Sequence, residues 1–162
     1  MPAAGSSVAE ALACRIARDD DERERHFAIR RAVFCGEQRM FGGADDRDEH
    51  DDADTTLHAV GAEHDVVGGT VRLYPLPAPG LWRGDRLAVL PAFRHGSLGG
   101  SLVRFAVRTA GEAGGERMVA MIQLPNVRFF LALGWSVDGP AATFHGREHQ
   151  PMAIALSPGG GG

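Results

Sequence analysis

The stretch RLAVLPAFRHGSLGGSLVR, from Arg86 to Arg104, decides how this sequence is expected to fold. It contains a short apolar strand, a turn at Pro91, a glycine-rich loop opened by Arg94, and the start of an amphipathic helix. Backbone N–H groups of such a loop and of a helix N-terminus can converge on an anion, and glycines leave the approach open. A tight turn that needs glycine only for its backbone angles fits the same spacing. The stretch therefore predicts either a phosphate-holding loop or a purely structural turn.

Outward from this stretch, hydrophobic periodicity predicts strands that alternate with helices. Strands are expected at 14–17, 55–62, 66–74, 86–90, 119–123, 136–144 and 151–156. Helices are expected at 22–40, 98–112 and 126–133, with polar turns at 63–65 and 145–150. The order β-α-β-β-β-α-β-α-β-β predicts an α/β protein with a mixed central sheet of six to seven strands covered by about four helices.

Length and composition indicate one soluble domain. The chain has 162 residues, of which 44% are hydrophobic and 23% charged, and its net charge of −4 gives general nucleic-acid binding little support. Residues 13–157 are expected to form the domain, between a disordered N-terminal segment at 1–12 and a flexible glycine tail at 158–162. The sequence has neither a basic leader nor a run of about 20 apolar residues, which predicts a cytoplasmic protein without a membrane segment.

The basic residues and the cysteines exclude several mechanisms. All 17 basic residues are arginine, whereas a Walker loop needs a lysine on the nucleotide phosphates and Schiff-base catalysis needs a lysine amine. The two cysteines, Cys14 and Cys35, are too few for a disulfide framework or a cysteine-based zinc site. The chemistry of this protein therefore has to come from other groups.

An acidic run, ADDRDEHDDAD, occupies residues 44–54 and holds seven carboxylates in eleven positions. Like charges at this density usually repel one another into solvent, which predicts a solvated, mobile loop. Alternatively, the run forms an acidic rim that attracts or positions a cationic substrate. The spacing of a calcium-binding EF-hand loop is missing.

Three motifs resemble the GNAT superfamily of N-acyltransferases. Arg94-His95-Gly96-Ser97-Leu98-Gly99 resembles its loop of Arg or Gln followed by x-x-Gly-x-Gly/Ala, with Ser97 where the first glycine usually stands, and Val89-Leu90-Pro91 resembles the Val-x-Pro before that loop. NVRFFLALGW, at 126–135, resembles the later motif of an Asn, an aromatic pair and Gly-Phe. IRRAVFCGEQ, at 29–38, resembles the first helix of a branch related to acyl-homoserine-lactone synthases. The resemblance extends to small bacterial N-acyltransferases found beside nitrilase genes and linked to nitrogen starvation.

The resemblance implies acetyl-CoA or another acyl-CoA as donor, a small-molecule amine as acceptor and no metal, and it leaves room for a homodimer. In such proteins the fourth strand pairs with the pantetheine arm, the loop holds the pyrophosphate, and strands four and five splay apart to admit the donor. The corresponding cofactor-binding residues are Leu87, Ala88, Val89, Arg94, His95, Gly96, Ser97, Leu98, Gly99 and Gly100. Asn126 and Phe130 are expected near the cofactor thiol.

The implied reaction is attack of a neutral amine on a thioester, which needs a base and an N–H donor for the oxyanion. Glu37, in the first helix, and His149, in the last polar turn, are the predicted catalytic residues, with Asp85 and His145 as further candidate bases. His145 and His149 stand four residues apart, but no third ligand is evident, so no metal site is expected.

Phe130 departs from the family pattern. Many members have a tyrosine at this position, which protonates the leaving thiolate. Here the thiolate leaves unaided, or Cys35 or water takes over that role. Two alternatives to an acyl-CoA-dependent N-acyltransferase therefore stay open: a non-catalytic acyl-CoA-binding or regulatory module, and an enzyme that makes acyl-homoserine lactones from S-adenosylmethionine.

Overall fold

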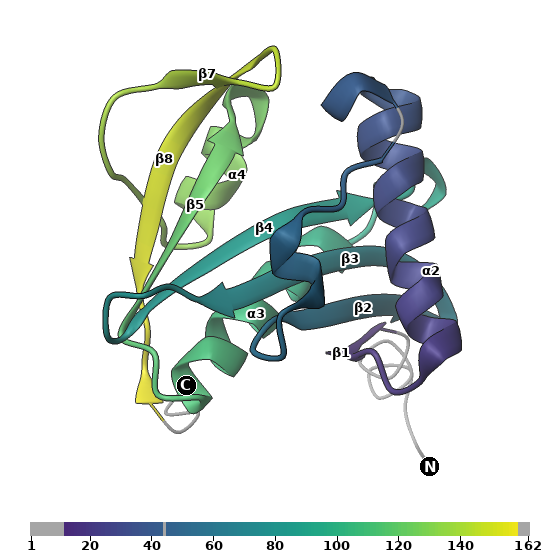
Figure 1. Cartoon of the computed structure of the whole chain (residues 1–162), viewed down its shortest axis with the longest axis horizontal. Coiled ribbons are helices and arrows are strands. Elements are labelled where there is room, and N and C mark those ends of the chain that lie inside the picture. Colours follow the sequence, from purple (N-terminus) through teal and green to yellow (C-terminus); the bar gives the residue numbers. More distant parts are fainter. Residues whose placement is uncertain (1–11, 44, 159–162) are drawn as a thin grey trace. The chain divides into compact units, whose positions relative to one another are not determined.

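The computed structural model describes residues 12–43 and 45–158, and within them eight strands and three α-helices alternate (Figure 1). The strands are β1 (Leu12–Ile16), β2 (Leu57–Glu63), β3 (Val66–Pro75), β4 (Leu81–Val89), β5 (Arg117–Gln123), β6 (Ser136–Val137), β7 (Ala142–Phe144) and β8 (Arg147–Ala155). The α-helices are α2 (Asp20–Arg30), α3 (Leu98–Glu112) and α4 (Val127–Ala132). Shorter helical segments are the π-helix η1 (Arg31–Glu37) and the 3-10 turns η2 (Phe41–Gly43), η3 (Glu49–Asp52), η4 (Pro91–Phe93) and η5 (Leu124–Asn126). The expected disordered segment and glycine tail lie outside the described residues, except for Leu12 and Pro158.

The prediction of a mixed α/β sheet is confirmed. Hydrogen-bonded neighbours follow the order β1-β2-β3-β4-β5-β8-β6, and β7 pairs with β8. β4 and β5 are parallel from Leu81↔Arg117 to Arg83↔Val119, whereas β5 and β8 are antiparallel. The single strand predicted at 136–144 is wrong: it divides into β6 and β7, because Gly139 adopts a φ of +120° and the following proline has no N–H to donate.

The chain divides into two compact units. Unit 1 contains the residues up to Asp46 together with Leu57–Arg72 and Arg86–Phe105, and unit 2 contains Arg47–Thr56, Leu73–Asp85 and the chain from Ala106 onward. β3, β4 and α3 each run from one unit into the other. Among the described helices, none combines the length and the hydropathy that crossing a membrane requires.

In unit 1, α2 begins where the acidic residues predict a helix N-terminus. Asp19 is the N-cap, and its side chain accepts a hydrogen bond of 2.9 Å from the Glu22 N–H. The helix packs on the face of β2 that carries His58, whose ring lies 4.9 Å from the ring of His26 and 5.1 Å from that of Phe27 (Figure 1). The predicted helix at 22–40 is confirmed over α2, continues as the π-helix η1, and ends at Glu37, so the prediction is wrong for residues 38–40.

The start of α3 packs closely on the opposite face of β2 and of its neighbour β3. His58 and Gly61 stand three residues apart in β2, so they point to opposite faces of the sheet. A Cβ on Gly61 would lie 2.9 Å from Leu98 Cδ1, and one on Gly69 would lie 2.8 Å from Leu102 Cδ1. Both leucines are fully buried. Glycine at these two strand positions therefore lets the first turns of α3 pack directly on the backbone of the sheet.

Glu22, in the first turn of α2, is hydrogen-bonded to Arg15 of β1, and we expect this contact to stabilise the fold. Its carboxylate accepts hydrogen bonds from Arg15 and, at 2.8 Å, from Arg18 Nη2. These bonds hold the pKa of Glu22 well below its usual value. A lowered carboxyl pKa stabilises the folded state above the unfolded pKa, about 4.3, and this stabilisation is lost as the pH falls through the folded value. We expect Glu22→Gln to lower the Tm at neutral pH by roughly 2–4 °C, the equivalent of about 1 kcal/mol.

The measurement is thermal unfolding of both proteins between neutral pH and about pH 3. The difference in Tm should be constant down to about pH 5 and shrink below it. Glu24→Gln, at an exposed glutamate in the same helix, is the matched control and should leave the Tm unchanged. An equal effect of both substitutions would contradict a specific role for Glu22.

Candidate active site

The loop predicted to hold phosphate lies in unit 1, between β4 and α3. The Leu90 N–H donates to the carbonyl of Gly68 at 2.9 Å, and a Cβ on Gly68 would lie 2.4 Å from the ring of Phe93, so η4 packs tightly on β3. The carbonyl of Ser97 accepts the Ser101 N–H at 3.0 Å, which makes it the first acceptor of α3. The N–H groups of the first turn therefore have no acceptor within the helix. Residues 94–97, which lead into this turn, are exposed, whereas Leu98 and Gly100 are buried.

Arg94, which opens this loop, is paired with the predicted base Glu37. Arg94 Nη1 and Nη2 donate to the two carboxylate oxygens of Glu37 at 2.6 and 2.5 Å, and Arg94 Nε donates to the carbonyl of Val89 at 2.8 Å. Both charged side chains are 41% exposed. The hydrogen bonds from Arg94 lower the pKa of Glu37, and those to Glu37 raise the pKa of Arg94. Two residues that the sequence assigned to different tasks thus form one pair, in which Glu37 is a weaker proton acceptor than a free carboxylate.

Arg104 of α3 is a second cation near the loop, and it is not among the predicted cofactor-binding residues. It is exposed in α3, and a Cβ on Gly100 would lie 3.3 Å from its Nη2. Side chains of a helix lean toward its N-terminus, so a residue four positions after a glycine can cover the first turn. In the sequence, the four-residue spacing of Gly100 and Arg104 could have indicated that Arg104 covers this turn. One arginine therefore precedes the start of α3 in the chain, and another lies against its first turn.

Unit 1 contains a buried ion cluster that includes Arg86 of β4. Asp46 Oδ2 accepts hydrogen bonds from Arg30 Nε at 2.7 Å and from Arg86 Nε at 2.9 Å, and the Asp46 carbonyl accepts a third from Arg86 Nη2 at 2.8 Å. Arg30 and Asp46 are almost completely buried. Arg86 has a φ of +53°, and its carbonyl accepts a hydrogen bond of 2.9 Å from Thr70 Oγ1. The cluster therefore holds a strained position of β4 immediately before the predicted pantetheine-binding residues Leu87, Ala88 and Val89.

The interpretation of the acidic run as a solvated loop is wrong for Asp46 and Asp51, each of which is 1% exposed. Asp46 is held by the two arginines. Asp51 accepts the Asp48 N–H at 2.9 Å and closes a capping box at the start of η3. The physical reason is that a carboxylate with charged or N–H donors can be buried at acceptable cost, which charge density along a sequence does not report.

In unit 2, the aromatic pair of the later motif divides between core and surface. Phe130 is buried, with its ring edge-on to Trp135 at 5.3 Å, whereas Phe129 is 40% exposed. The predicted short helix is confirmed, because the Trp135 N–H returns to the carbonyl of Phe130 and Gly134 takes a φ of +95°. Asn126 is exposed at the start of α4. Phe130 offers no proton donor, so any acid for the leaving thiolate is another group.

His149 lies in β8 and not in a polar turn, which corrects the predicted turn at 145–150. The actual turn consists of His145 and Gly146, both with positive φ, and β8 begins directly after it. His149 stands opposite Gln123 of β5 and is only 4% exposed. Its Nδ1 lies 2.8 Å from the carbonyl of Arg147, and because a carbonyl only accepts, Nδ1 carries the proton. In the neutral ring Nε2 is then the nitrogen that can take a proton.

The remaining candidates occupy varied environments. Cys35 is buried in η1, and burial raises the pKa of its thiol, which disfavours a thiolate nucleophile. Asp85 is half-buried in β4, and His145 is exposed in the β7–β8 turn, edge-on to the ring of Phe144. The predicted site residues thus divide between the units. Glu37 and the residues of β4 and its loop lie in unit 1, whereas Asn126, Phe130 and His149 lie in unit 2.

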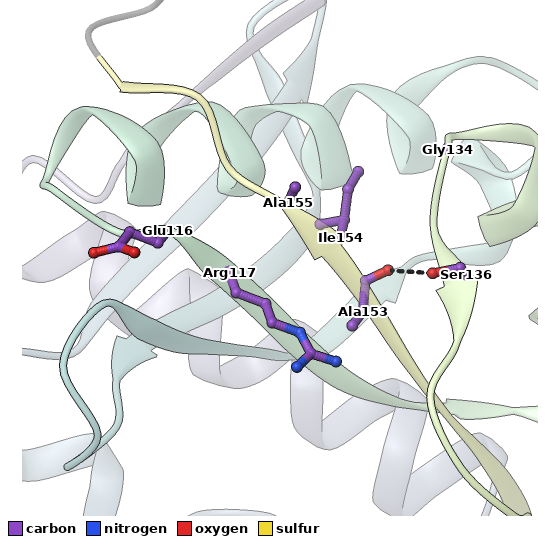
Figure 2. A pocket seen from close by; sticks show the side chains of 7 residues that line it. All are labelled: Glu116, Arg117, Gly134, Ser136, Ala153, Ile154 and Ala155. Atoms are coloured by element: carbon purple, nitrogen blue, oxygen red, sulfur yellow. Dashed lines mark hydrogen bonds between the residues drawn. The ribbon is translucent and has the colours of Figure 1, made fainter.

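A shallow hollow of about 230 Å³ is found elsewhere in unit 2, at the surface of β5, β6 and β8 (Figure 2). Its lining residues are Glu116, Arg117, Gly134, Ser136, Ala153, Ile154 and Ala155. Figure 2 shows Ser136 Oγ directed at the carbonyl of Ala153, at 3.5 Å, and Arg117 pairs with Asp138 at 2.7 Å. None of the predicted site residues lines this hollow, so we assign it no role in catalysis.

Several solved structures have a similar fold, among them the following three. Escherichia coli ElaA has a TM-score of 0.76 and 18% identity, over 88% of this chain and 97% of that chain. An acyl-CoA N-acyltransferase from Pseudomonas aeruginosa has a TM-score of 0.73 and 20% identity, over 88% and 97%. The CoA-dependent acyl-homoserine lactone synthase BjaI, with SAM and isopentyl-CoA, has a TM-score of 0.73 and 19% identity, over 90% and 83%. At these identities the likeness shows the fold.

No curated protein matches the sequence. The profile of the family described as Acetyltransferase (GNAT) does match, over residues 14–135. This range covers most of the chain and includes the first helix, the loop opened by Arg94 and the motif around Phe130, so all three resemblances fall inside it. The nitrilase-linked subfamily stays a prediction. With the fold and the matched range in agreement, the chain belongs to the GNAT acetyltransferase family, a family of acyltransferase enzymes.

Proposed function

We propose that the protein transfers an acyl group from acyl-CoA to the amine of a small molecule, by direct attack of the amine on the thioester. The observation that carries the proposal is the exposed loop at 94–97 that leads into α3, with Arg94 opening it and Arg104 lying against the first turn of the helix, in a chain of this family. Converging N–H groups and guanidinium groups are what a pyrophosphate requires. The acyl-CoA bound by BjaI supports the same class of donor.

We assign the donor to β4 and the loop that follows it. β4 pairs with β5 through Leu81–Arg83, and Leu87–Val89 lies beyond this ladder, where its backbone groups could pair with the pantetheine amides. The loop from Arg94 to Gly100 would hold the pyrophosphate. Leu98 in this loop is buried and anchors it, whereas Gly96 is exposed and has no side chain to block a ligand.

In the reaction, the amine nitrogen forms a bond to the thioester carbon, the carbon–sulfur bond breaks, and CoA leaves as a thiolate that takes up a proton. A backbone N–H of β4 would stabilise the oxyanion. Of the two predicted bases, His149 has an unprotonated Nε2, because its Nδ1 donates its proton to the carbonyl of Arg147. Glu37 is paired with Arg94 and has a lowered pKa. Because Phe130 has no proton to give, we assign protonation of the thiolate to water.

The test combines binding with turnover. CoA or acetyl-CoA at millimolar concentration should raise the Tm, because a ligand at 100 times its Kd stabilises the folded state by about 2.7 kcal/mol. Acetyl-CoA with a panel of small amines should then release free thiol, measured with a thiol reagent. The absence of any CoA-dependent shift would sink the proposal.

A non-catalytic acyl-CoA-binding module is the second candidate, favoured by the buried phenylalanine at position 130. It predicts the same rise in Tm without thiol release for any amine in the panel. S-adenosylmethionine belongs in that panel, because release of thiol with this amine alone, accompanied by a lactone product, would identify the third reading of the sequence.

A further inference from the structure

The ion pair between Glu37 and Arg94 occupies the guanidinium that the proposed function assigns to the donor. Its two hydrogen bonds are short, 2.6 and 2.5 Å, and join the two Nη atoms to the two carboxylate oxygens. Both residues belong to unit 1, on segments 57 positions apart in the sequence. The pair lies at the surface, where a ligand can reach it, since each side chain is 41% exposed.

Arg94 has no free edge of its guanidinium group for bidentate binding of a phosphate. A guanidinium has five N–H donors and offers two edges for bidentate binding, one between the two Nη atoms and one between Nε and an Nη. Glu37 takes the first edge. The carbonyl of Val89 accepts the Nε donor of the second edge at 2.8 Å. A phosphate oxygen pair therefore has to displace one of these two partners.

Glu37 is the partner that a phosphate would displace. The carbonyl of Val89 is part of the backbone at the end of β4 and carries no net charge, so it can stay beside a bound anion. A carboxylate next to a pyrophosphate is repelled by it, and its side chain can turn into solvent because it is exposed. A glutamate carboxylate is charged at neutral pH, and the hydrogen bonds from Arg94 lower the pKa of Glu37 further, so the carboxylate is charged when an anion arrives.

We propose that Glu37 is a built-in competitor for the pyrophosphate of the donor, so that the donor binds by an exchange of partners on Arg94. The inference rests on the proposed function. Val89 keeps the Arg94 side chain in place during the exchange, and the carboxylate of Glu37 is released when the donor arrives. The pair thereby lowers the affinity for any anion at this loop, and only a ligand with further contacts, such as those of a pantetheine arm on β4, overcomes the competition.

The experiment is a double-mutant cycle on the full chain, with the Kd of CoA measured by calorimetry. Glu37→Gln keeps the shape of the side chain, loses its charge and weakens its grip on Arg94. We expect it to tighten CoA binding by roughly two- to fivefold, the range expected from an exposed ion pair. In an Arg94→Ala background the same substitution should leave the Kd unchanged, since there is no guanidinium left to compete for. Pantetheine, which lacks the phosphates, should bind the native protein and Glu37→Gln equally.

The outcomes separate this inference from the proposed function. If neither the native protein nor Glu37→Gln binds CoA, the proposed function fails and the inference with it. If the native protein binds CoA through Arg94 but Glu37→Gln binds it equally or more weakly, the inference alone fails, and Glu37 would instead orient Arg94 for the phosphate. Tightening that persists in the Arg94→Ala background would also overturn it. Glu37 is exposed, and the Tm of each variant checks that it is folded.

Discussion

Asp46→Ala is expected to lower the free energy of unfolding by about 3–5 kcal/mol, because it removes the buried carboxylate that balances the charge of two guanidinium groups. Asp46 is 1% exposed and receives hydrogen bonds from two guanidinium groups, those of Arg30 and Arg86. Arg30 is completely buried and cannot turn to solvent when the carboxylate is removed. The measurement is urea unfolding of the native protein and the variant, read by far-UV circular dichroism.

A matched control is available in the same acidic run. Asp54→Asn removes the same charge at an exposed position, and it should change the free energy of unfolding by less than about 0.5 kcal/mol. Asp46→Asn keeps the volume and some hydrogen bonding, so its effect should lie between those of the two other variants. If Asp46→Ala and Asp54→Asn have the same effect, the cluster does not hold unit 1 together.

Arg94→Ala is expected to weaken CoA binding by roughly 10- to 100-fold, which corresponds to the loss of a charge-assisted hydrogen-bonded contact worth about 1.5–3 kcal/mol. The same substitution should change the Tm of the unliganded protein little, because the pair with Glu37 is exposed. The Kd of CoA, measured by calorimetry, therefore separates a role in binding from a role in folding.

Two further variants sharpen this prediction. Arg94→Lys keeps the charge but cannot bind bidentately, so its Kd should fall between those of the native protein and Arg94→Ala. Arg31→Ala removes an exposed arginine of η1 in the same unit and should leave CoA binding unchanged. Equal weakening by Arg31→Ala and Arg94→Ala would mean that only net charge matters and that the loop is a structural turn.

Elements set by neighbouring residues could be predicted from the sequence. The β2–β3 hairpin is one example: a polar turn between two β-branched runs predicted it, and the structure has His64 and Asp65 at φ of 50° and 67°. The start of α2 is another, since Asp19 and the acids after it act on N–H groups within the same turn. The turn from β4 into α3 likewise depends on residues adjacent in the chain.

Positions that depend on contacts distant in sequence could not be predicted. The helical periodicity did not show that η1 is π-helical, with the Gln38 N–H bonded to the carbonyl of Val33. The burial of His149 was missed because a run of polar residues suggested a longer turn. In the structure the strand pairing with β5 extends to that residue.

The sequence by itself determined the class of fold, the order of its elements and the loop opened by Arg94. All of these arise from local periodicity, glycine positions and capping residues, which act over a few positions of the chain. Only the tertiary structure decided which charges meet: Glu37 with Arg94, 57 residues apart, and Asp46 with Arg86, 40 residues apart. A side chain's pKa and its availability to a ligand follow from such partners, and the folding of distant segments against one another is what selects them.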